Sequence, residues 1–388
     1  MPDLTEQITR EHALEQKSDR KAVNPNDIPI SYEAITSEWL THILCKGHPG
    51  AKVIAHRLDV PDEGNTNRRR IFITYNEAGI AANLPPSVFC KASHKLANRL
   101  VLANCGLIQG ETAFYNKYRA MLDIEAPTPI LATYSPITYN SIIMLDDLVR
   151  HGATFCKHDT EMTRQRAESQ MALLAKVHGR FYDSAELKAA DLPSFKGSFD
   201  FSDGWFGLKD CSNRGFQVAE AVIPARLFRR YAEIWPATLK SAAVHDALPT
   251  TFTHTDTHLR NWYIALNGEM GLCDWQAPSK GHWGRDVAYA MSSGLAIENR
   301  RAWERELLQF YLDRLHAAGG PVIPFAEAWK QYRQHLFTSL AWWTLTIAPS
   351  SGTSDEPPPD FQPRDACLAF IGRMATAIDD LDALSSFD

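Results

Sequence analysis

The sequence has no paired-cysteine motif, although it contains seven cysteines. Their number is odd, and no Cys-x-x-Cys spacing occurs among them. Disulfide frameworks and structural zinc sites normally use cysteines in pairs, so this pattern favours reduced thiols and a cytoplasmic protein. The opening residues show no basic segment followed by an apolar run, so no secretory signal is expected.

Long apolar runs and an excess of basic residues are also missing. The most apolar late segment, residues 336–347, is too short and too rich in threonine to span a bilayer. The formal net charge is -6, whereas binding to nucleic-acid phosphates normally requires a basic face. We therefore expect neither a membrane span nor a nucleic-acid partner, and the sequence leaves the oligomeric state open.

Two glycine-rich signatures of nucleotide-binding folds are absent. Neither Gly-x-Gly-x-x-Gly nor Gly-x-x-x-x-Gly-Lys-Ser/Thr occurs, which argues against Rossmann and P-loop sites. The chain nevertheless has 388 residues, of which 45% are hydrophobic and 22% charged. This composition is ordinary for a globular protein, and the length allows two lobes, each with its own core.

The most informative residues that are present lie between positions 254 and 286. Asp256 is followed by Asn261 at an offset of five and then, after the length of a short strand, by Asp274. Phosphoryl transfer from a nucleotide needs a carboxylate that orients the acceptor hydroxyl and oxygen ligands that hold Mg²⁺ on the phosphates. The same Asp-to-Asn offset occurs in the catalytic loop of protein kinases. We therefore predict that Asp256 is catalytic and that Asn261 and Asp274 bind magnesium, although a turn or strand end would explain each residue singly.

These residues belong to a longer pattern: His254-x-Asp256-x-His258-x-x-Asn261, then Asp274-Trp275-Gln276, then Gly284-Arg285-Asp286-Val287-Ala288-Tyr289. The pattern resembles the aminoglycoside phosphotransferase-like superfamily. Its Asp-Trp-Gln form is most similar to the ecdysteroid-kinase-like and related bacterial small-molecule kinases. The family usually has Gly where this chain has Thr255. The resemblance covers about residues 50–385, but only residues 254–289 carry highly specific motifs.

The resemblance implies an α+β, bilobal, protein-kinase-like fold. A small mixed N-lobe with an antiparallel sheet would bind ATP, with GTP as an alternative donor, and a larger, mainly helical C-lobe would carry the catalytic loop. Mg²⁺ would assist transfer to a hydroxyl of a small molecule. His254 and His258 would support the catalytic loop. Asp286 would brace the loop through backbone hydrogen bonds, although a simple helix N-cap accounts for this residue nearly as well.

The residue pattern along the chain fits this division. Residues 1–27 are polar and predict a flexible N-terminal arm, residues 28–146 the nucleotide-binding N-lobe, and residues 147–388 the catalytic and acceptor-binding C-lobe. The predicted strands are 53–58, 70–75, 88–91 and 141–145, and the predicted helices are 37–44, 110–118, 161–182, 216–245, 301–317, 325–347 and 365–384. The segment 350–359, rich in Ser and Pro, predicts a loop.

The N-lobe offers candidates for nucleotide binding. Lys91 ends an apolar strand, where a lysine must be paired to be tolerated, and the predicted pair is Glu111 together with nucleotide phosphates. An exposed lysine and an exposed glutamate are the alternative. The phosphate-covering loop is predicted at residues 59–69, where one glycine and two polar neighbours form the turn, namely Gly64, Asn65 and Thr66. By resemblance, a hinge that meets adenine with backbone groups is formed by Met144, Asp146 and Leu148.

Two other classes of function fit parts of the sequence. His254, Asp256 and His258 are the residue types of a zinc or iron site, which would make the protein a metal-dependent hydrolase. The glycine-poor phosphate loop would suit a nucleotide-binding pseudokinase or regulatory module.

Aromatic residues in the C-lobe favour an apolar alcohol as the acceptor, provided that they line the acceptor pocket and not the core. These residues are Phe199, Phe201, Trp205, Phe206, Trp342 and Trp343.

Overall fold

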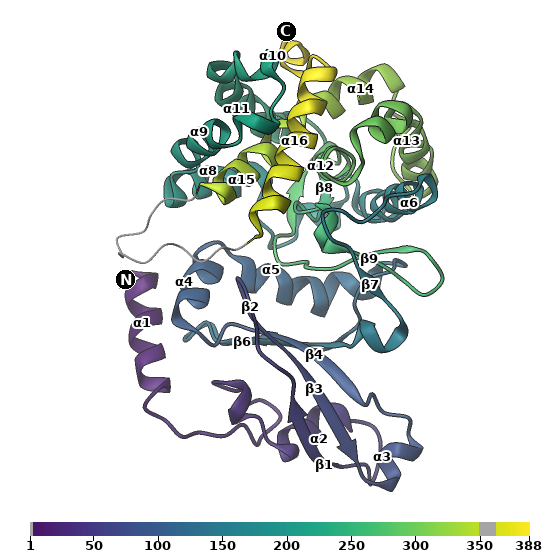
Figure 1. The fold of residues 1–388 in the computed structure, drawn as a ribbon. Coiled ribbons are helices and arrows are strands. Elements are labelled where there is room, and N and C mark those ends of the chain that lie inside the picture. Colours follow the sequence, from purple (N-terminus) through teal and green to yellow (C-terminus); the bar gives the residue numbers. More distant parts are fainter. Residues whose placement is uncertain (1–2, 349–361) are drawn as a thin grey trace. The chain divides into compact units, whose positions relative to one another are not determined.

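The computed structural model describes residues 3–348 and 362–388 (Figure 1). The chain divides into two compact units, which consist of Met1–Met121 with Pro127–Ala153, and of Leu122–Ala126 with Thr154–Asp388. The first unit thus continues beyond residue 146, and the assignment of lobe roles to residues 28–146 and 147–388 stays a prediction. The predicted loop at 350–359 lies outside the described residues.

The first unit is built on an antiparallel sheet in the order β1-β3-β4-β6-β5. Its strands are β1 (Val53–Leu58), β2 (Asp62–Glu63), β3 (Asn67–Tyr75), β4 (Ser87–Ala92), β5 (Pro129–Tyr134) and β6 (Ser141–Asp146), with β2 paired to the start of β3. The sequence pattern predicts β1, β3, β4 and β6 but misses the two-residue β2 and also β5, which begins with Pro129. Proline is tolerated there because β5 is an edge strand and Pro129 is its first residue.

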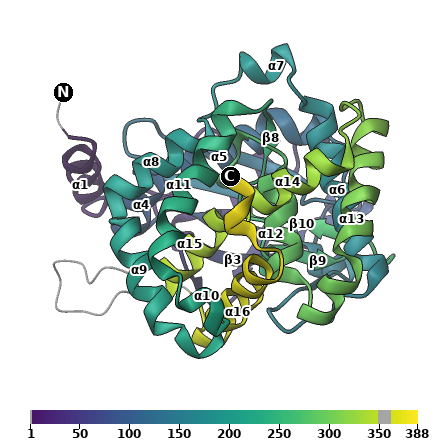
Figure 2. The same ribbon diagram turned by 90° about the horizontal axis from the view of Figure 1, so that it is seen from above.

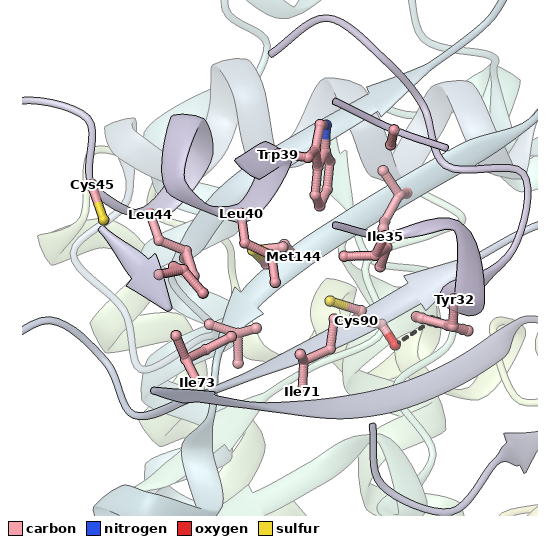
Figure 3. Close-up of a cluster of buried hydrophobic side chains, with 14 of the residues drawn as sticks. Tyr32, Ile35, Trp39, Leu40, Leu44, Cys45, Ile71, Ile73, Cys90 and Met144 are labelled. Carbon is pink, nitrogen blue, oxygen red and sulfur yellow. Dashed lines mark hydrogen bonds between the residues drawn. The ribbon is translucent and has the colours of Figure 1, made fainter. Parts of the chain in front are cut away.

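Helix α2 (Ser37–Leu44) covers one face of this sheet and forms the core of the first unit with it (Figure 3). Trp39 and Leu40 of α2 are fully buried. They pack against a cluster that includes Cys90 and Met144, whose strands pair so that both side chains lie on the same face. Successive residues of a strand point to opposite faces, so the side chain of Lys91 lies on the face away from α2. The N-cap of α2 is Thr36, whose hydroxyl accepts from the N–H of Trp39.

The other helices of the first unit are α1 (Leu4–Glu15), α3 (Glu77–Ala81), α4 (Leu96–Asn104) and α5 (Leu107–Ala113). The helix predicted over 110–118 therefore begins earlier, and its last turn, Phe114–Tyr118, is a π-helix. Short 3-10 turns at Tyr32–Ala34, Arg119–Met121 and Leu148–His151 complete the unit.

The segment predicted as a flexible arm differs from that prediction, since it contains α1. Ile8 is fully buried in a small apolar cluster with residues of α4. Glu15, at the end of α1, lies 2.6 Å from the guanidinium of Arg99, a side chain with no exposed surface. Residues 1–27 are mostly polar, and the few apolar residues that dock them, Leu4, Ile8 and Ala22, are widely spaced, so the sequence pattern alone does not predict a docked helix.

The second unit is mainly helical (Figure 2). Its helices are α6 (Arg164–Phe181), α7 (Ala185–Lys188), α8 (Phe195–Phe206), α9 (Leu208–Val218), α10 (Ala225–Phe228), α11 (Tyr231–Ala247), α12 (Gly284–Gly294), α13 (Ile297–Ala317), α14 (Phe325–Gln334), α15 (Phe337–Ile347) and α16 (Arg364–Asp380). Its strands are short: β7 (Thr154–Phe155), β8 (Thr251–Thr253), β9 (Trp262–Ile264), β10 (Met270–Leu272) and β11 (Ser279–Gly281). The α+β fold class, with an antiparallel sheet followed by a helical region, is confirmed.

The predicted long helices in this unit are interrupted. The segment 216–245 contains the end of α9, a 3-10 turn, α10 and α11, because Ile223 takes an extended conformation ahead of Pro224. The segment 325–347 divides into α14 and α15. Within the described residues, no helix is long and apolar enough to cross a membrane.

Candidate active site

The loop that the sequence predicts to be catalytic joins β8 to β9 in the second unit and is braced by Asp286. The Asp286 carboxylate accepts the backbone N–H groups of His254 at 2.7 Å and Thr255 at 2.8 Å. Asp286 lies in the first turn of α12, but the N-cap position is Trp283, so Asp286 does not act as a simple cap. Its carboxylate is fully buried, and His178 Nε2 lies 3.2 Å away. The bracing contact implied by the family resemblance is therefore present.

Asp256 keeps a partly accessible carboxylate within this loop, with 35% of its side-chain surface exposed. Its Oδ1 accepts from the Tyr289 hydroxyl at 3.2 Å, and its Oδ2 accepts from Asn261 Nδ2 at 3.1 Å. His258 Nε2 lies 3.5 Å from Oδ2. Burial would raise the pKa of Asp256, but the neighbouring charges, chiefly that of His258, outweigh it and hold this pKa below its usual value. Asp256 is therefore ionised near neutral pH and retains lone pairs for an acceptor hydroxyl.

His254 serves the loop through both ring nitrogens. Its Nδ1 accepts the Asp256 N–H at 3.2 Å, and its Nε2 then donates to the carbonyl of Cys273 at 3.0 Å. Burial lowers the pKa of His254, in agreement with a neutral ring. Neither nitrogen is left for a metal, and within residues 3–348 and 362–388 no group of three or more His, Cys, Asp or Glu could hold a metal ion. These contacts argue against the hydrolase reading.

Thr255, the residue that departs from the family pattern, adopts a left-handed conformation with φ of 68°. A β-branched residue rarely takes this conformation, which explains why glycine is usual there. Three hydrogen bonds hold Thr255 in place. Its N–H donates to Asp286, its carbonyl accepts from Arg285 at 2.9 Å, and its hydroxyl donates to the carbonyl of Ala277 at 2.8 Å.

The two predicted magnesium ligands are brought together by the pairing of β9 with β10. Asn261 immediately precedes β9 and Asp274 lies just beyond β10, and the N–H of Cys273 donates to the carbonyl of Asn261 at 2.9 Å. The Asn261 amide nitrogen donates to the backbone carbonyl of Asp256 at 2.8 Å and to its carboxylate, which leaves the amide oxygen as the atom suited to a cation. Asp274 has a φ of 63°, a strained conformation of the kind that clusters at functional sites. An amide and a carboxylate oxygen fit Mg²⁺, which binds few protein groups in addition to phosphate.

In the first unit, Lys91 and Glu111 form the predicted ion pair. Their charged atoms are 2.7 Å apart, and both residues are buried, with 8% and 3% exposure. Lys91 lies on β4, the third long strand along the chain, where protein kinases carry their phosphate-binding lysine. Glu111 comes from α5. The geometry thus matches the predicted pair, and the role of this pair in nucleotide binding stays a prediction.

The predicted phosphate loop, residues 59–69, contains β2, the tight turn after it and the first residues of β3, so only part of it is a loop. Gly64 N–H donates to the carbonyl of Thr66 at 3.2 Å. The side chain of Asn98, from α4, donates to the carbonyls of Gly64 at 2.8 Å and Asn65 at 2.7 Å. Arg68 lies directly across from Lys91 in the β3–β4 pairing and therefore shares its face. In the sequence Arg68 is one of three consecutive arginines, and only the strand register shows that it lies on the same face of the sheet as Lys91.

The predicted hinge residues have different environments. The side chain of Met144 is fully buried in the core beneath α2, so only its backbone could meet a nucleotide on the Lys91 face. The carboxylate of Asp146 accepts from Arg150 at 2.9 Å and His151 at 2.8 Å, and Leu148 begins the 3-10 turn that follows.

The sequence reasoning missed the residues of β6 that share the face of Lys91, namely Ile143 and Leu145. Ile143 is the cross-strand partner of Lys91. Successive residues of a strand point to opposite faces, so the neighbours of Met144 in β6 could have been identified as residues of the Lys91 face from the sequence.

The aromatic residues predicted to line an acceptor pocket separate into two groups. Phe199 is buried and Trp342 half-buried in a core cluster of the second unit. Phe201 and Trp205 are exposed and stacked on each other, 6.0 Å between ring centres, and Phe206 is half-buried.

Trp343 lies next to residues that contact the Asp256 carboxylate. Its Nε1 donates to the Tyr289 hydroxyl at 2.5 Å, and its ring centre is 5.2 Å from that of His258. Since Tyr289 and His258 both contact Asp256, an aromatic wall adjoins this residue.

Comparison with known proteins supports the motif reading. The model of the phosphotransferase enzyme family matches residues 157–333. The resemblance stated from the motifs is thereby confirmed at the level of this family, and the ecdysteroid-kinase-like branch is not specifically shown. No curated protein matches the sequence.

Solved structures that are similar to this chain include small-molecule kinases. The choline kinase from Cryptosporidium parvum Iowa II is 12% identical, with 90% of this chain and 98% of that chain covered and a TM-score of 0.50. A spectinomycin phosphotransferase, solved with ADP and spectinomycin, is 13% identical over 88% and 97% of the two chains, with a TM-score of 0.47. The ethanolamine kinase from Plasmodium vivax is 9% identical over 97% and 94%, with a TM-score of 0.46. The likeness to the choline kinase shows a kinase-like fold.

Proposed function

We propose that this protein is an ATP-dependent, Mg²⁺-assisted phosphotransferase that acts on a hydroxyl group of a small molecule. The observation that carries the proposal is the braced catalytic loop, in which Asp256 is ionised, partly accessible and hydrogen-bonded to Asn261. The family match over residues 157–333 supports phosphoryl transfer as the class of reaction.

Asp256 would orient the acceptor hydroxyl and take its proton late in the reaction. A carboxylate with a lowered pKa is a weak base, so its main contribution is position and charge, which suits the loose transition state of phosphoryl transfer. The Tyr289 hydroxyl and the Asn261 amide fix the rotation of this carboxylate before the acceptor arrives.

Asn261 and Asp274 would hold magnesium through one amide oxygen and one carboxylate. The bound ion would neutralise charge that develops on the transferred phosphoryl group. Lys91, kept in place by Glu111, would orient the nucleotide phosphates. Arg68 shares the strand face of Lys91 and would add a second cation on it.

The acceptor would be a largely apolar alcohol. Trp343 and Phe370 both contact the ring of His258 and are themselves buried, so apolar side chains pack behind the Asp256 carboxylate. An acceptor with an apolar body would gain about 25 cal/mol for each Å² of its own apolar surface that binding removes from water.

An acceptor screen tests the proposal. The purified protein, with Mg²⁺ and ATP, is incubated with apolar alcohols, aminoglycosides, choline-like amines and sugars, and ADP formation and product mass are measured. We expect phosphorylation of apolar alcohols, which Lys91→Ala abolishes or strongly reduces. Phosphorylation of aminoglycosides alone would contradict the acceptor class, and no phosphorylated product from any hydroxyl compound would contradict the proposed reaction.

A further inference from the structure

Helix α4 connects the docked helix α1 with the turn of the predicted phosphate loop. α1 packs along α4, and Ile8 is fully buried in a cluster with Leu102 and Ala103 (Figure 1). Asn98 and Arg99 are neighbours on α4, and their side chains make contacts in two directions. Asn98 reaches the turn after β2, and Arg99 reaches the end of α1. These two neighbours therefore link an N-terminal helix to a loop that is distant in sequence.

The side chain of Asn98 holds the turn by its backbone. Its Nδ2 donates to the carbonyl of Gly64 at 2.8 Å and to that of Asn65 at 2.7 Å. Within the turn, the N–H of Gly64 donates to the carbonyl of Thr66 at 3.2 Å. Backbone N–H groups bind phosphate well only when the turn that carries them keeps one conformation. The place of Asn98 on α4 therefore matters for the shape of the predicted phosphate loop.

Arg99 fixes α4 from inside the first unit, since its side chain has no exposed surface. Its Nε donates to the carbonyl of Ser93 at 2.8 Å, and its Nη1 donates to that of Thr138 at 3.3 Å. A carboxylate oxygen of Glu15 lies 2.6 Å from Nη1. Burial lowers the pKa of Arg99, and the charge of Glu15 opposes this change. A buried guanidinium that loses its carboxylate is strongly unfavourable, so removal of Glu15 would drive Arg99 toward water and displace α4 with it.

Helix α1 carries a second glutamate that serves as a matched control. Glu11 lies 2.9 Å from Arg10 of the same helix, and this ion pair does not involve α4. The side chain of Arg10 is exposed, and an exposed ion pair contributes little to stability. The two glutamates therefore share a helix and a charge and differ in the element that carries the partner.

We propose that Glu15 and Arg99 are positioning residues for nucleotide binding, because they fix α4 so that Asn98 holds the turn of the phosphate loop. The role in nucleotide binding rests on the proposed function, whereas the effect on the turn rests on the contacts within the first unit. The docking of α1 would thus influence the affinity for nucleotide through one side chain of α4.

Hydrogen–deuterium exchange of the full chain without nucleotide tests the effect on the turn. Glu15→Gln and Asn98→Ala should each speed exchange in a peptide covering residues 62–68 roughly threefold to tenfold, as expected for loss of a hydrogen bond. Glu11→Gln should leave this exchange unchanged. A peptide covering residues 70–75 reports on β3, an interior strand of the sheet, and should exchange equally in every variant.

Two results of this exchange experiment would overturn the proposal. One is unchanged exchange at residues 62–68 in Glu15→Gln or in Asn98→Ala. The other is an equal rise at residues 70–75, since this would show a general loss of stability and no specific hold on the turn.

Calorimetric titration with Mg²⁺-ATP tests the role in nucleotide binding. Glu15→Gln and Asn98→Ala should each bind ATP roughly threefold to tenfold more weakly than the wild type, and Glu11→Gln should bind it equally well. Because Glu15 acts through Asn98, the double variant Glu15→Gln/Asn98→Ala should bind ATP about as weakly as Asn98→Ala alone. If the two effects multiply in the double variant, the residues act independently and the proposal is wrong.

The two readouts separate this inference from the proposed function. Faster exchange at residues 62–68 in Glu15→Gln with an unchanged affinity for ATP would overturn the role of the pair in nucleotide binding. A wild type that binds no ATP would contradict the proposed function, and faster exchange in Glu15→Gln would then still support the hold of α1 on the turn.

Discussion

At the scale of single residues, the candidate site depends on side chains that are held in place before any ligand binds. The carboxylate of Asp256 has both oxygens hydrogen-bonded, and Asn261 uses its nitrogen to fix Asp256 and keeps its oxygen for a cation. Each contact removes rotational freedom that would otherwise be lost on substrate binding. Preorganised charge of this kind is usually the largest contribution to phosphoryl transfer.

The proposed magnesium site has one carboxylate ligand and one amide ligand, so substitution of each should weaken ATP binding to a different extent. Asp274→Ala should remove most of the Mg²⁺-dependent affinity for ATP, and Asn261→Ala should weaken it less, because a carboxylate holds a divalent ion more strongly than an amide does. Calorimetry of ATP binding with and without Mg²⁺ measures both. Unchanged Mg²⁺-ATP affinity in Asp274→Ala would remove Asp274 from the site.

The left-handed backbone at Thr255 predicts that the protein tolerates a glycine there better than a valine. Thr255→Val keeps the strained backbone and leaves the carbonyl of Ala277 without its donor, which should cost about 1–2 kcal/mol in the free energy of unfolding. Thr255→Gly loses the same hydrogen bond but releases about 1–3 kcal/mol of left-handed strain. Urea denaturation should therefore show Thr255→Gly to be the more stable variant. The opposite order would mean that the backbone at residue 255 is not strained.

At the scale of elements, close packing of α9 on α15 depends on Gly215. A Cβ atom added to Gly215 would lie 1.8 Å from the backbone oxygen of Thr344, which cannot move without displacing its helix. Gly215→Ala should therefore destabilise the protein by about 3 kcal/mol or more, at the upper end of overpacking effects. The matched control is Gly204→Ala in α8, where a Cβ atom meets nothing within 4 Å and the change should be neutral or slightly stabilising. Equal denaturation midpoints for the two variants would contradict this packing.

Elements with strong local patterns were predictable, and those defined by distant contacts were not. The strand at residues 53–58 and the helix at residues 37–44 follow from their own apolar and β-branched residues, and their bounds agree with β1 and α2. The docking of helix α1 could be predicted only by knowing that Ile8 packs on α4. The face on which the Met144 side chain lies could be predicted only from the pairing of β6 with β4. The braced loop at residues 254–261 was predictable because phosphoryl transfer requires particular residue types at short spacings, and these residues stand out in the sequence.

At the scale of the whole molecule, buried histidines predict a stability that falls in acid. His245, His282 and His335 are buried and in ring contact, and burial, followed by neighbouring charges, lowers the pKa of each well below its usual value. In the unfolded chain these groups titrate near pH 6.5. Below that pH the unfolded state binds protons that the folded state does not, so the free energy of unfolding decreases as the pH falls.

The expected slope is up to about 1.4 kcal/mol per pH unit for each histidine below pH 6.5, with little contribution from these groups above it. Urea denaturation between pH 8 and pH 5 measures the slope. His335→Leu should reduce this slope, because it removes one of the three titrating groups. The fold should tolerate the change, since both ring nitrogens of His335 lack hydrogen-bond partners and their loss leaves no other group unpaired. A slope that His335→Leu leaves unchanged would show that other groups cause the acid sensitivity.

The most direct test of the central claim is the detection of a phosphorylated hydroxyl product by mass spectrometry, with Mg²⁺-ATP and the best acceptor from the screen. The wild type should form the ester, and Asp256→Ala should lower turnover by roughly 10²–10⁴-fold, the range for loss of a positioned general base, while its affinity for ATP stays close to that of the wild type. Full turnover in Asp256→Ala on that acceptor would contradict the account.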